Sequence, residues 1–208
     1  MQFRSFTFLF CLTCVACSIL PTPSGRVSKY ILVKPNLVAY VGKARSLDLL
    51  VLQPSLSTVL QENNRILYYP TSQKIEYLAG GEWVQKVDLI IWECLIDSFK
   101  SAHVFRTVTS DPTKISDSPA ILRTYVAFLG VVNKEDGKYV QVVYEFVLEG
   151  KDNKVLWQKT IEESSKLEQF ELDGVVADLN KLHQNALKEL ITSSVLQIPN
   201  LPASPKTT

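Results

Sequence analysis

The four cysteines are the residues whose type and spacing point most directly to chemistry. A thiol can form a disulfide, bind a metal ion or carry an acyl chain. Cys11, Cys14 and Cys17 crowd one short apolar stretch near the N-terminus, whereas Cys94 stands alone in the body of the chain. This distribution excludes a disulfide-stapled scaffold. If Cys17 is acylated, Cys94 has no partner, and we predict that it is a small buried hydrophobic residue.

The first sixteen residues have the pattern of a signal peptide. Arg4 supplies one positive charge, and the apolar run Ser5–Ala16 follows it. That run is shorter than the ~20 apolar residues that a transmembrane helix needs. Pro21 and Pro23 prevent a helix from continuing beyond it. We therefore predict a signal peptide over residues 1–16.

The end of this run, Cys14-Val15-Ala16-Cys17-Ser18, resembles a bacterial lipobox, in which a cysteine is lipidated and becomes the new N-terminus. Ala16 fits the position before the cut, although Cys14 stands where leucine is usual. Cys17 is therefore the predicted lipidation site. Two or three acyl chains hold a protein on a bilayer firmly, because each buried CH₂ contributes ~0.8 kcal/mol. The alternative is an ordinary secretory signal cut near Ala16, which leaves a free periplasmic protein.

The composition of the rest of the chain is that of a single folded domain with a net charge near zero. The 208 residues are 46% hydrophobic and 21% charged, with 22 Lys and Arg against 21 Asp and Glu. Without Arg4 the positive and negative side chains are equal in number, so no basic face for nucleic acid is expected.

We predict a lipidated N-terminus and Pro/Ser-rich tether over 17–29, one domain over 30–197 and a disordered tail over 198–208.

Hydrophobic periodicity predicts the elements that would position any site. Alternation and turn residues predict strands, whereas apolar residues at helical spacing predict two long helices. The expected strands cover 46–52, 65–69, 74–78, 104–108, 121–132, 138–149 and 154–163, and the helices cover 84–100 and about 173–190. Gly80-Gly81 is expected to form a turn, and Asp136-Gly137 a hairpin. The order predicts an α+β fold, a mostly antiparallel sheet with a C-terminal-half meander and two main helices covering one face.

Residues 46–105 carry a pattern similar to that of a known family. A strand ends at Pro54, Ile66 and Tyr68 form an I-x-Y element, and Ile75–Ala79 precede a helix opened by Trp83. With the later meander and closing helix, about 45–195 resembles the ABC-type transport auxiliary lipoprotein family. The resemblance implies a periplasm-facing lipoprotein without catalytic activity. Its partners would be a mammalian-cell-entry-domain protein, an ABC permease and an ATPase that move phospholipid or another hydrophobic compound between membranes.

Membrane lipid would be contacted through the N-terminal anchor. Ser18 rather than aspartate after Cys17 suggests the outer rather than the inner membrane, by similarity to enterobacterial sorting rules. The alternative function is a structural or regulatory envelope lipoprotein that binds the cell wall or an assembly machine. The sequence leaves the oligomeric state open, a homo-oligomer included.

Several residues could belong to a ligand-binding or metal site, but each has a simpler structural explanation. Tyr68, Tyr77 and Trp83 could frame a lipid-contacting groove, yet aromatics at a sheet–helix junction are more often packed core. His183 is expected at the boundary of the apolar stripe of its helix, and His103 in solvent. Two isolated histidines and one cysteine have no metal-ligand spacing, so neither a metal nor a cofactor is expected.

Catalytic motifs are similarly weak. Gly80-Gly81 precedes a helix but lacks the remainder of a phosphate-binding motif, and Glu82 would repel phosphate. Glu162 and Glu163 are adjacent on an expected strand, so their side chains point to opposite faces and cannot work as an acid/base pair. No G-x-S-x-G elbow occurs, which makes a secreted hydrolase the weakest hypothesis. The sequence therefore predicts a protein that is not an enzyme.

Overall fold

The long strand β7 (Ala120–Lys134) organises the sheet of the computed structural model. The structure describes residues 27–37, 47–115, 119–150 and 153–197. The predicted signal peptide, Cys17, residues 18–26 of the predicted tether and the tail lie outside them. One edge of β7 pairs antiparallel with β8 (Gly137–Glu149), which pairs antiparallel with β9 (Val155–Lys166). The predicted meander and its hairpin at Asp136-Gly137 are confirmed, and Gly137 supplies the positive φ of the turn.

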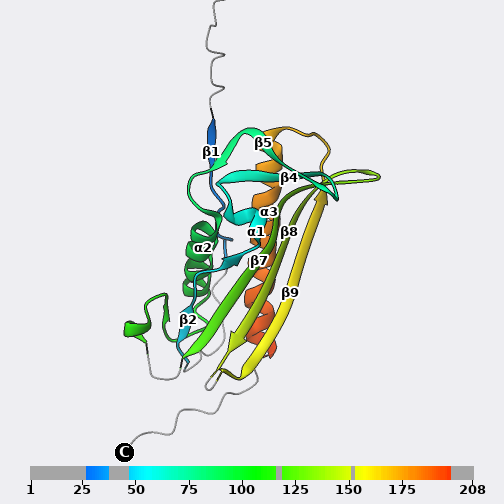
Figure 1. Ribbon diagram of the computed structural model, residues 1–208. Coiled ribbons are helices and arrows are strands. Elements are labelled where there is room, and N and C mark those ends of the chain that lie inside the picture. Colours follow the sequence, from blue (N-terminus) through cyan, green and yellow to red (C-terminus); the bar gives the residue numbers. More distant parts are fainter. Residues whose placement is uncertain (1–26, 38–46, 116–118, 151–152, 198–208) are drawn as a thin grey trace, which may run out of the picture.

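The other edge of β7 is shared by three short parallel strands in succession. They pair at Leu49↔Ala120, Ser55↔Tyr125 and Leu67↔Gly130. These strands are β2 (Leu49–Val51), β3 (Ser55–Leu56) and β4 (Arg65–Thr71). The outer strands are β5 (Lys74–Trp83), antiparallel to β4, β1 (Ser28–Tyr30), parallel to β5, and β6 (Val108–Thr109), parallel to β2. The result is one curled, mixed sheet in an α+β fold (Figure 1).

Two long helices lie against the same face of the sheet. They are α2 (Val87–Ala102) and α3 (Leu172–Gln197), and a short helix α1 (Thr58–Gln61) and a 3₁₀ turn (Pro112–Lys114) complete the described helices. The inner side of α2 is apolar because Ile90, Ile91 and Leu95 recur at helical spacing and are buried. The helix ends at His103, whose left-handed φ of 52° forms the C-cap. Both predicted helices are confirmed, and α3 continues beyond the predicted residue 190.

Three sequence predictions about short segments are wrong. The last two residues of the predicted tether, Ser28 and Lys29, belong to β1, which adds to the edge of β5. Gly80-Gly81 lies inside β5 rather than in a turn, and an added Cβ at Gly81 would lie 2.7 Å from the Leu172 side chain. Residues 104–108 are not a strand, since only Val108 joins one.

Side-chain contacts and two backbone hydrogen bonds hold residues 104–107 after α2. Val104 and Phe105 are buried, and Phe105 packs edge-on against Phe99 of α2. The Arg106 guanidinium donates two hydrogen bonds, of 2.8 and 2.6 Å, to the buried carboxylate of Asp48. The Arg106 N–H donates to the Leu47 carbonyl and the Leu49 N–H to the Thr107 carbonyl, so the segment runs beside the chain that enters β2.

The junction of β4 and β7 depends on a close backbone approach at Gly130. A Cβ added there would lie 2.5 Å from the Leu67 carbonyl oxygen, a separation that only displacement of the backbone could relieve. Glycine is therefore required where the parallel strand β4 meets the far half of β7.

We predict that Gly130→Ala lowers the free energy of unfolding by about 1–3 kcal/mol, the usual cost of overpacking a core. Gly174→Ala, in the first turns of α3, is the matched control, because an added Cβ there meets nothing within 4 Å. The control should be neutral or slightly stabilising, since alanine favours helices over glycine. Urea denaturation of both variants measures the difference. Equal stabilities would show that Gly130 has no special role.

Candidate functional site

The first described segment, Val27–Leu37, fastens the N-terminal end of the chain to the folded body. We call it the docking segment. Its strand β1 runs parallel to β5 in the register Ser28↔Gly81, and its edge carries an ion pair of 2.5 Å between Lys29 and Glu82. Any pull on the chain before Val27 is therefore transmitted first to the sheet.

Beyond β1 the docking segment is held by α3. The Tyr30 hydroxyl donates a 2.5 Å hydrogen bond to the Asp173 carboxylate, and this bond raises the pKa of Tyr30. The Asn180 side chain binds two backbone groups, because it accepts from the Val33 N–H at 2.7 Å and donates to the Ile31 carbonyl at 3.1 Å. One amide side chain thus replaces a neighbouring strand as the hydrogen-bond partner of this extended backbone.

The same segment also contacts α2. Leu32 is buried, and the Cys94 thiol donates to its carbonyl at 3.6 Å. Lys34 pairs with Asp97 at 3.2 Å at the surface. A shallow hollow of about 220 Å³ lies between the segment and α2, lined by Ile31–Lys34, Ile90, Glu93, Cys94 and Asp97. The segment therefore closes the seam between the two helices.

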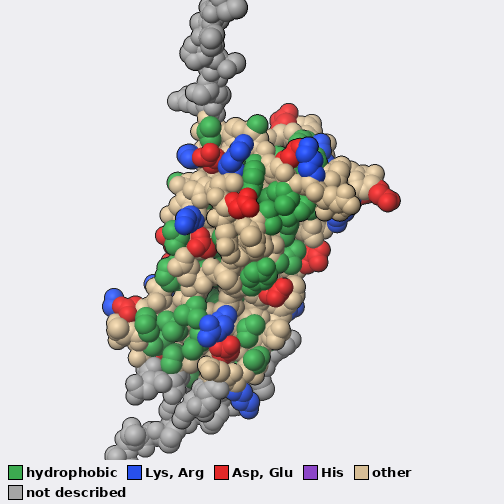
Figure 2. Space-filling view, in the orientation of Figure 1, with side chains coloured by type: hydrophobic (Ala, Val, Ile, Leu, Met, Phe, Trp, Pro, Cys, Tyr) green, Lys and Arg blue, Asp and Glu red, His purple; other side chains and the backbone are tan. Residues whose placement is uncertain are grey.

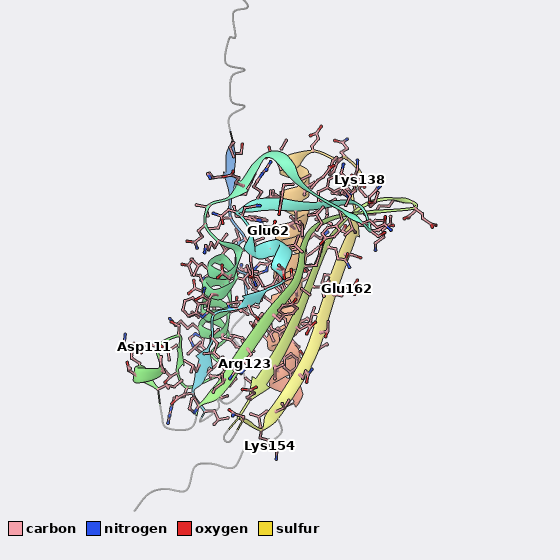
Figure 3. The ribbon with its side chains drawn as sticks, in the orientation of Figure 1. Glu62, Asp111, Arg123, Lys138, Lys154 and Glu162 are labelled. Carbon is pink, nitrogen blue, oxygen red and sulfur yellow. The ribbon has the colours of Figure 1, made fainter. Side chains whose placement is uncertain are left out.

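Aromatic and lysine side chains gather at the end of the molecule where the docking segment begins. The Phe170 ring lies 5.3 Å from the Tyr68 ring, and the Lys138 ammonium lies 3.9 Å from the Phe170 ring centre. Lys138 is labelled at this end in Figure 3. We call Tyr68, Lys138 and Phe170 the tip cluster. Its members come from β4, β8 and the loop before α3, so only the folded chain brings them together. The exposed Ile75 of β5 lies on the opposite face of the β4–β5 hairpin, because Tyr68 pairs with Glu76 and side chains alternate along a strand.

A small apolar hollow of about 150 Å³ adjoins the tip cluster. It is lined by Leu78, Ala79, Phe170, Glu171, Leu172 and Val175, on β5 and the start of α3. Phe170 was not among the residues that the sequence singled out. It lies in a short loop between β9 and α3, and no periodic pattern marks it.

The three predicted aromatics do not share one groove. Trp83 is 1% exposed and belongs to the core. Tyr77 is half-buried and donates a 3.0 Å hydrogen bond to Glu62, whereas Tyr68 packs on Phe170 at the tip. The packed interpretation is thus confirmed for Trp83, and Tyr68 lies beside the partly exposed Phe170.

His183 is fully buried, which corrects the prediction that it lies at the boundary of the apolar stripe of α3. Its Nδ1 hydrogen-bonds the equally buried Tyr144 hydroxyl at 2.9 Å, and its Nε2 has no hydrogen-bond partner among the described residues. Burial lowers the pKa of His183 to about 3 and raises that of Tyr144. The imidazole is therefore neutral in the fold.

Cys94 lies near this pair and is 7% exposed, so its prediction as a buried residue is confirmed. Burial raises the pKa of its thiol to about 12, which leaves it protonated and unreactive. No substrate can reach Tyr144 or His183 without opening the core. These three side chains therefore belong to the packing of α2 and α3 on the sheet.

Other polar residues are dispersed. His103 is exposed, as predicted, and Glu162 and Glu163 lie on β9, where Glu162 is more exposed than Glu163. Across the described ranges, no three His, Cys, Asp or Glu side chains are placed to hold one metal ion. In the same ranges no helix combines the length and the apolar character needed to cross a bilayer.

Comparison with solved structures identifies the fold. A Xanthomonas campestris protein of the family model DUF330 superposes with a TM-score of 0.68 at 18% identity, over 82% of this chain and 96% of that one. An uncharacterised protein superposes with a TM-score of 0.65 at 16% identity, over 81% and 99%. No family model matches the sequence, and no curated protein matches it. At these identities the similarity establishes a shared fold.

We predict that His183 makes the protein sensitive to acid. The unfolded histidine titrates near pH 6.5 and the buried one at about 3, so the unfolded state binds more protons between these values. Stability from this group is complete above pH 6.5. It declines as the pH falls, by about 1.4 kcal/mol per pH unit.

The variant His183→Gln should lose this part of the pH dependence, because glutamine can still accept from the Tyr144 hydroxyl but does not titrate. Denaturant unfolding from pH 7 to pH 4 measures the slope for each protein. His103→Gln, at an exposed histidine, is the control and should keep the wild-type slope. The same slope in wild type and His183→Gln would contradict the assignment.

Proposed function

We propose that this protein is a lipoprotein of the bacterial envelope, fastened through acyl chains on Cys17 and facing the periplasm. In our proposal it is a non-enzymatic accessory subunit of an ABC-type, mammalian-cell-entry intermembrane lipid transport system. The observation that carries the anchoring is Cys17 at the end of an apolar run, separated by nine residues from a segment that is docked on the sheet and both helices.

The docking segment supports this arrangement mechanically. A lipid anchor restrains a domain only if the chain between them ends in a firmly held element. β1 supplies backbone pairing with β5, and the Asn180 and Asp173 contacts add hydrogen bonds to α3. Together they connect a leaflet to the folded body through a tether of nine residues, 18–26.

The transport assignment has separate support. The motifs at Pro54, Ile66 with Tyr68, Ile75–Ala79 and Trp83 resemble those of the auxiliary lipoprotein family. The fold shared with a DUF330 protein is compatible with that family resemblance. The outer membrane is the proposed location, because serine follows Cys17. A partner subunit would supply the ATP-driven step.

We predict that Cys17→Ser releases the protein from membranes. Wild type should sediment with the envelope, because two or three acyl chains hold a protein on a membrane far more firmly than one. Its N-terminal peptide should carry the added mass of the diacylglyceryl and acyl groups. Cys94→Ser is the matched control and should stay membrane-bound. Equal membrane retention of Cys17→Ser and wild type, with an unmodified Cys17 peptide in wild type, would contradict the anchoring.

We predict that a mammalian-cell-entry-domain protein is recovered after in-cell cross-linking and mild detergent extraction of the wild-type protein. Deletion of the gene should then weaken the lipid asymmetry of the outer membrane. Recovery of peptidoglycan without any transporter subunit would instead favour the structural or regulatory envelope function. Mass spectrometry of the cross-linked material separates the two outcomes.

A further inference from the structure

We propose that the tip cluster contacts the phospholipid headgroups of the leaflet that holds Cys17, with Phe170 inserted at the interface and Lys138 bound to phosphate oxygens. This inference rests on the proposed anchoring through Cys17. It adds a second contact with the membrane, made by the folded body, which fixes how the body is oriented.

The tip cluster lies at the end of the molecule from which the anchor chain departs. β1 pairs with the far end of β5, and Tyr30 binds Asp173 in the first turn of α3. Phe170 immediately precedes that turn and packs against Tyr68 of β4. In Figure 1, β1, the loop before α3 and the β7–β8 hairpin all lie at the upper end. The site of attachment and the tip cluster therefore belong to one end.

The tether is shorter than the body. Nine residues, 18–26, join Cys17 to Val27, and they span at most ~35 Å when fully extended and roughly 17 Å as a coil. The 13 residues of β8 span roughly 43 Å at about 3.3 Å per residue. Lys154 lies at the opposite end of the strands from Lys138 (Figure 3). The short tether therefore favours an orientation with the upper end next to the leaflet.

The side chains at this end suit a membrane interface. Phe170 is 43% exposed, and Val27, at the start of the docking segment, is 46% exposed. Amphipathic surfaces that combine aromatic or aliphatic residues with lysines bind at the boundary between headgroups and acyl chains. Hydrophobic, basic and acidic side chains occur together over this upper end in Figure 2.

Lys138 is the cation best placed for a phosphate. Its ammonium lies on the Phe170 ring, and within the described residues it forms no ion pair. The neighbouring Lys74 and Lys166 are paired with Glu76 and Asp136. Since Lys74 and Lys166 are paired and Glu168 and Glu171 flank Phe170 in the sequence, we expect shallow apolar insertion with one or two phosphate contacts rather than strong attraction to anionic lipid.

The test places a tryptophan at the tip and measures its depth. The mature chain from Cys17, which includes every described residue, is coupled through Cys17 to a maleimide lipid on vesicles of phosphatidylcholine with some phosphatidylglycerol. Buried Cys94 should not compete, because its thiol is protonated at neutral pH. Phe170→Trp reports on the tip, and Val155→Trp, at a residue 51% exposed at the opposite end, is the matched control.

The expected result is that brominated acyl chains quench Phe170→Trp at least twofold more than Val155→Trp, after subtraction of the wild-type signal. Adding Lys138→Glu to Phe170→Trp should reduce that quenching. Equal quenching at the two ends would overturn the inference. Because the lipid is attached chemically, the outcome does not depend on whether the cell acylates Cys17, so failure of the inference and failure of the proposed anchoring are distinguishable.

Discussion

The hydrogen-bonding capacity of β7 is the constraint on which the fold depends. Its backbone groups must be paired along 15 residues on both edges, since the strand lies in the middle of the sheet. β8 satisfies one edge over its whole length. On the other edge β2, β3 and β4 each pair with a successive part of β7, so residues 49–71 follow β7 in order. The chain reversal from β4 into β5 then builds the edge that receives β1.

This arrangement determines how an anchored N-terminus meets the body. β1 joins β5, the strand next to β4, and the residues after β1 run between α2 and α3. The docking segment therefore touches every layer of the fold within eleven residues, 27–37. It also begins at the same upper end of the molecule as the tip cluster, which is assembled where β4, the β7–β8 hairpin and the loop before α3 converge. The attachment and the membrane contact that we propose would both follow from this one topology.

Local patterns predicted the elements that are stabilised locally. Alternation in residues 138–149 and the Asp136-Gly137 turn predicted the meander, and helical spacing predicted α2 and α3. Contacts between distant segments were not predictable. β1 forms a strand by pairing with the edge of β5. His183 is buried beside Tyr144, which is its hydrogen-bond partner and lies 39 residues earlier in the chain. Phe170 gained its place in the tip cluster from Tyr68 and Lys138, far from it in sequence.

We propose that the folded body stands on the leaflet by its upper end, held there by Cys17 and the docking segment. Neutron reflectometry of the lipidated chain on a supported bilayer measures this orientation. We expect a protein layer that begins at the headgroups, without a water gap, and extends at least the roughly 43 Å of the long strands. A layer separated from the headgroups by a hydrated gap of the tether length, or a layer much thinner than the strands, would contradict it.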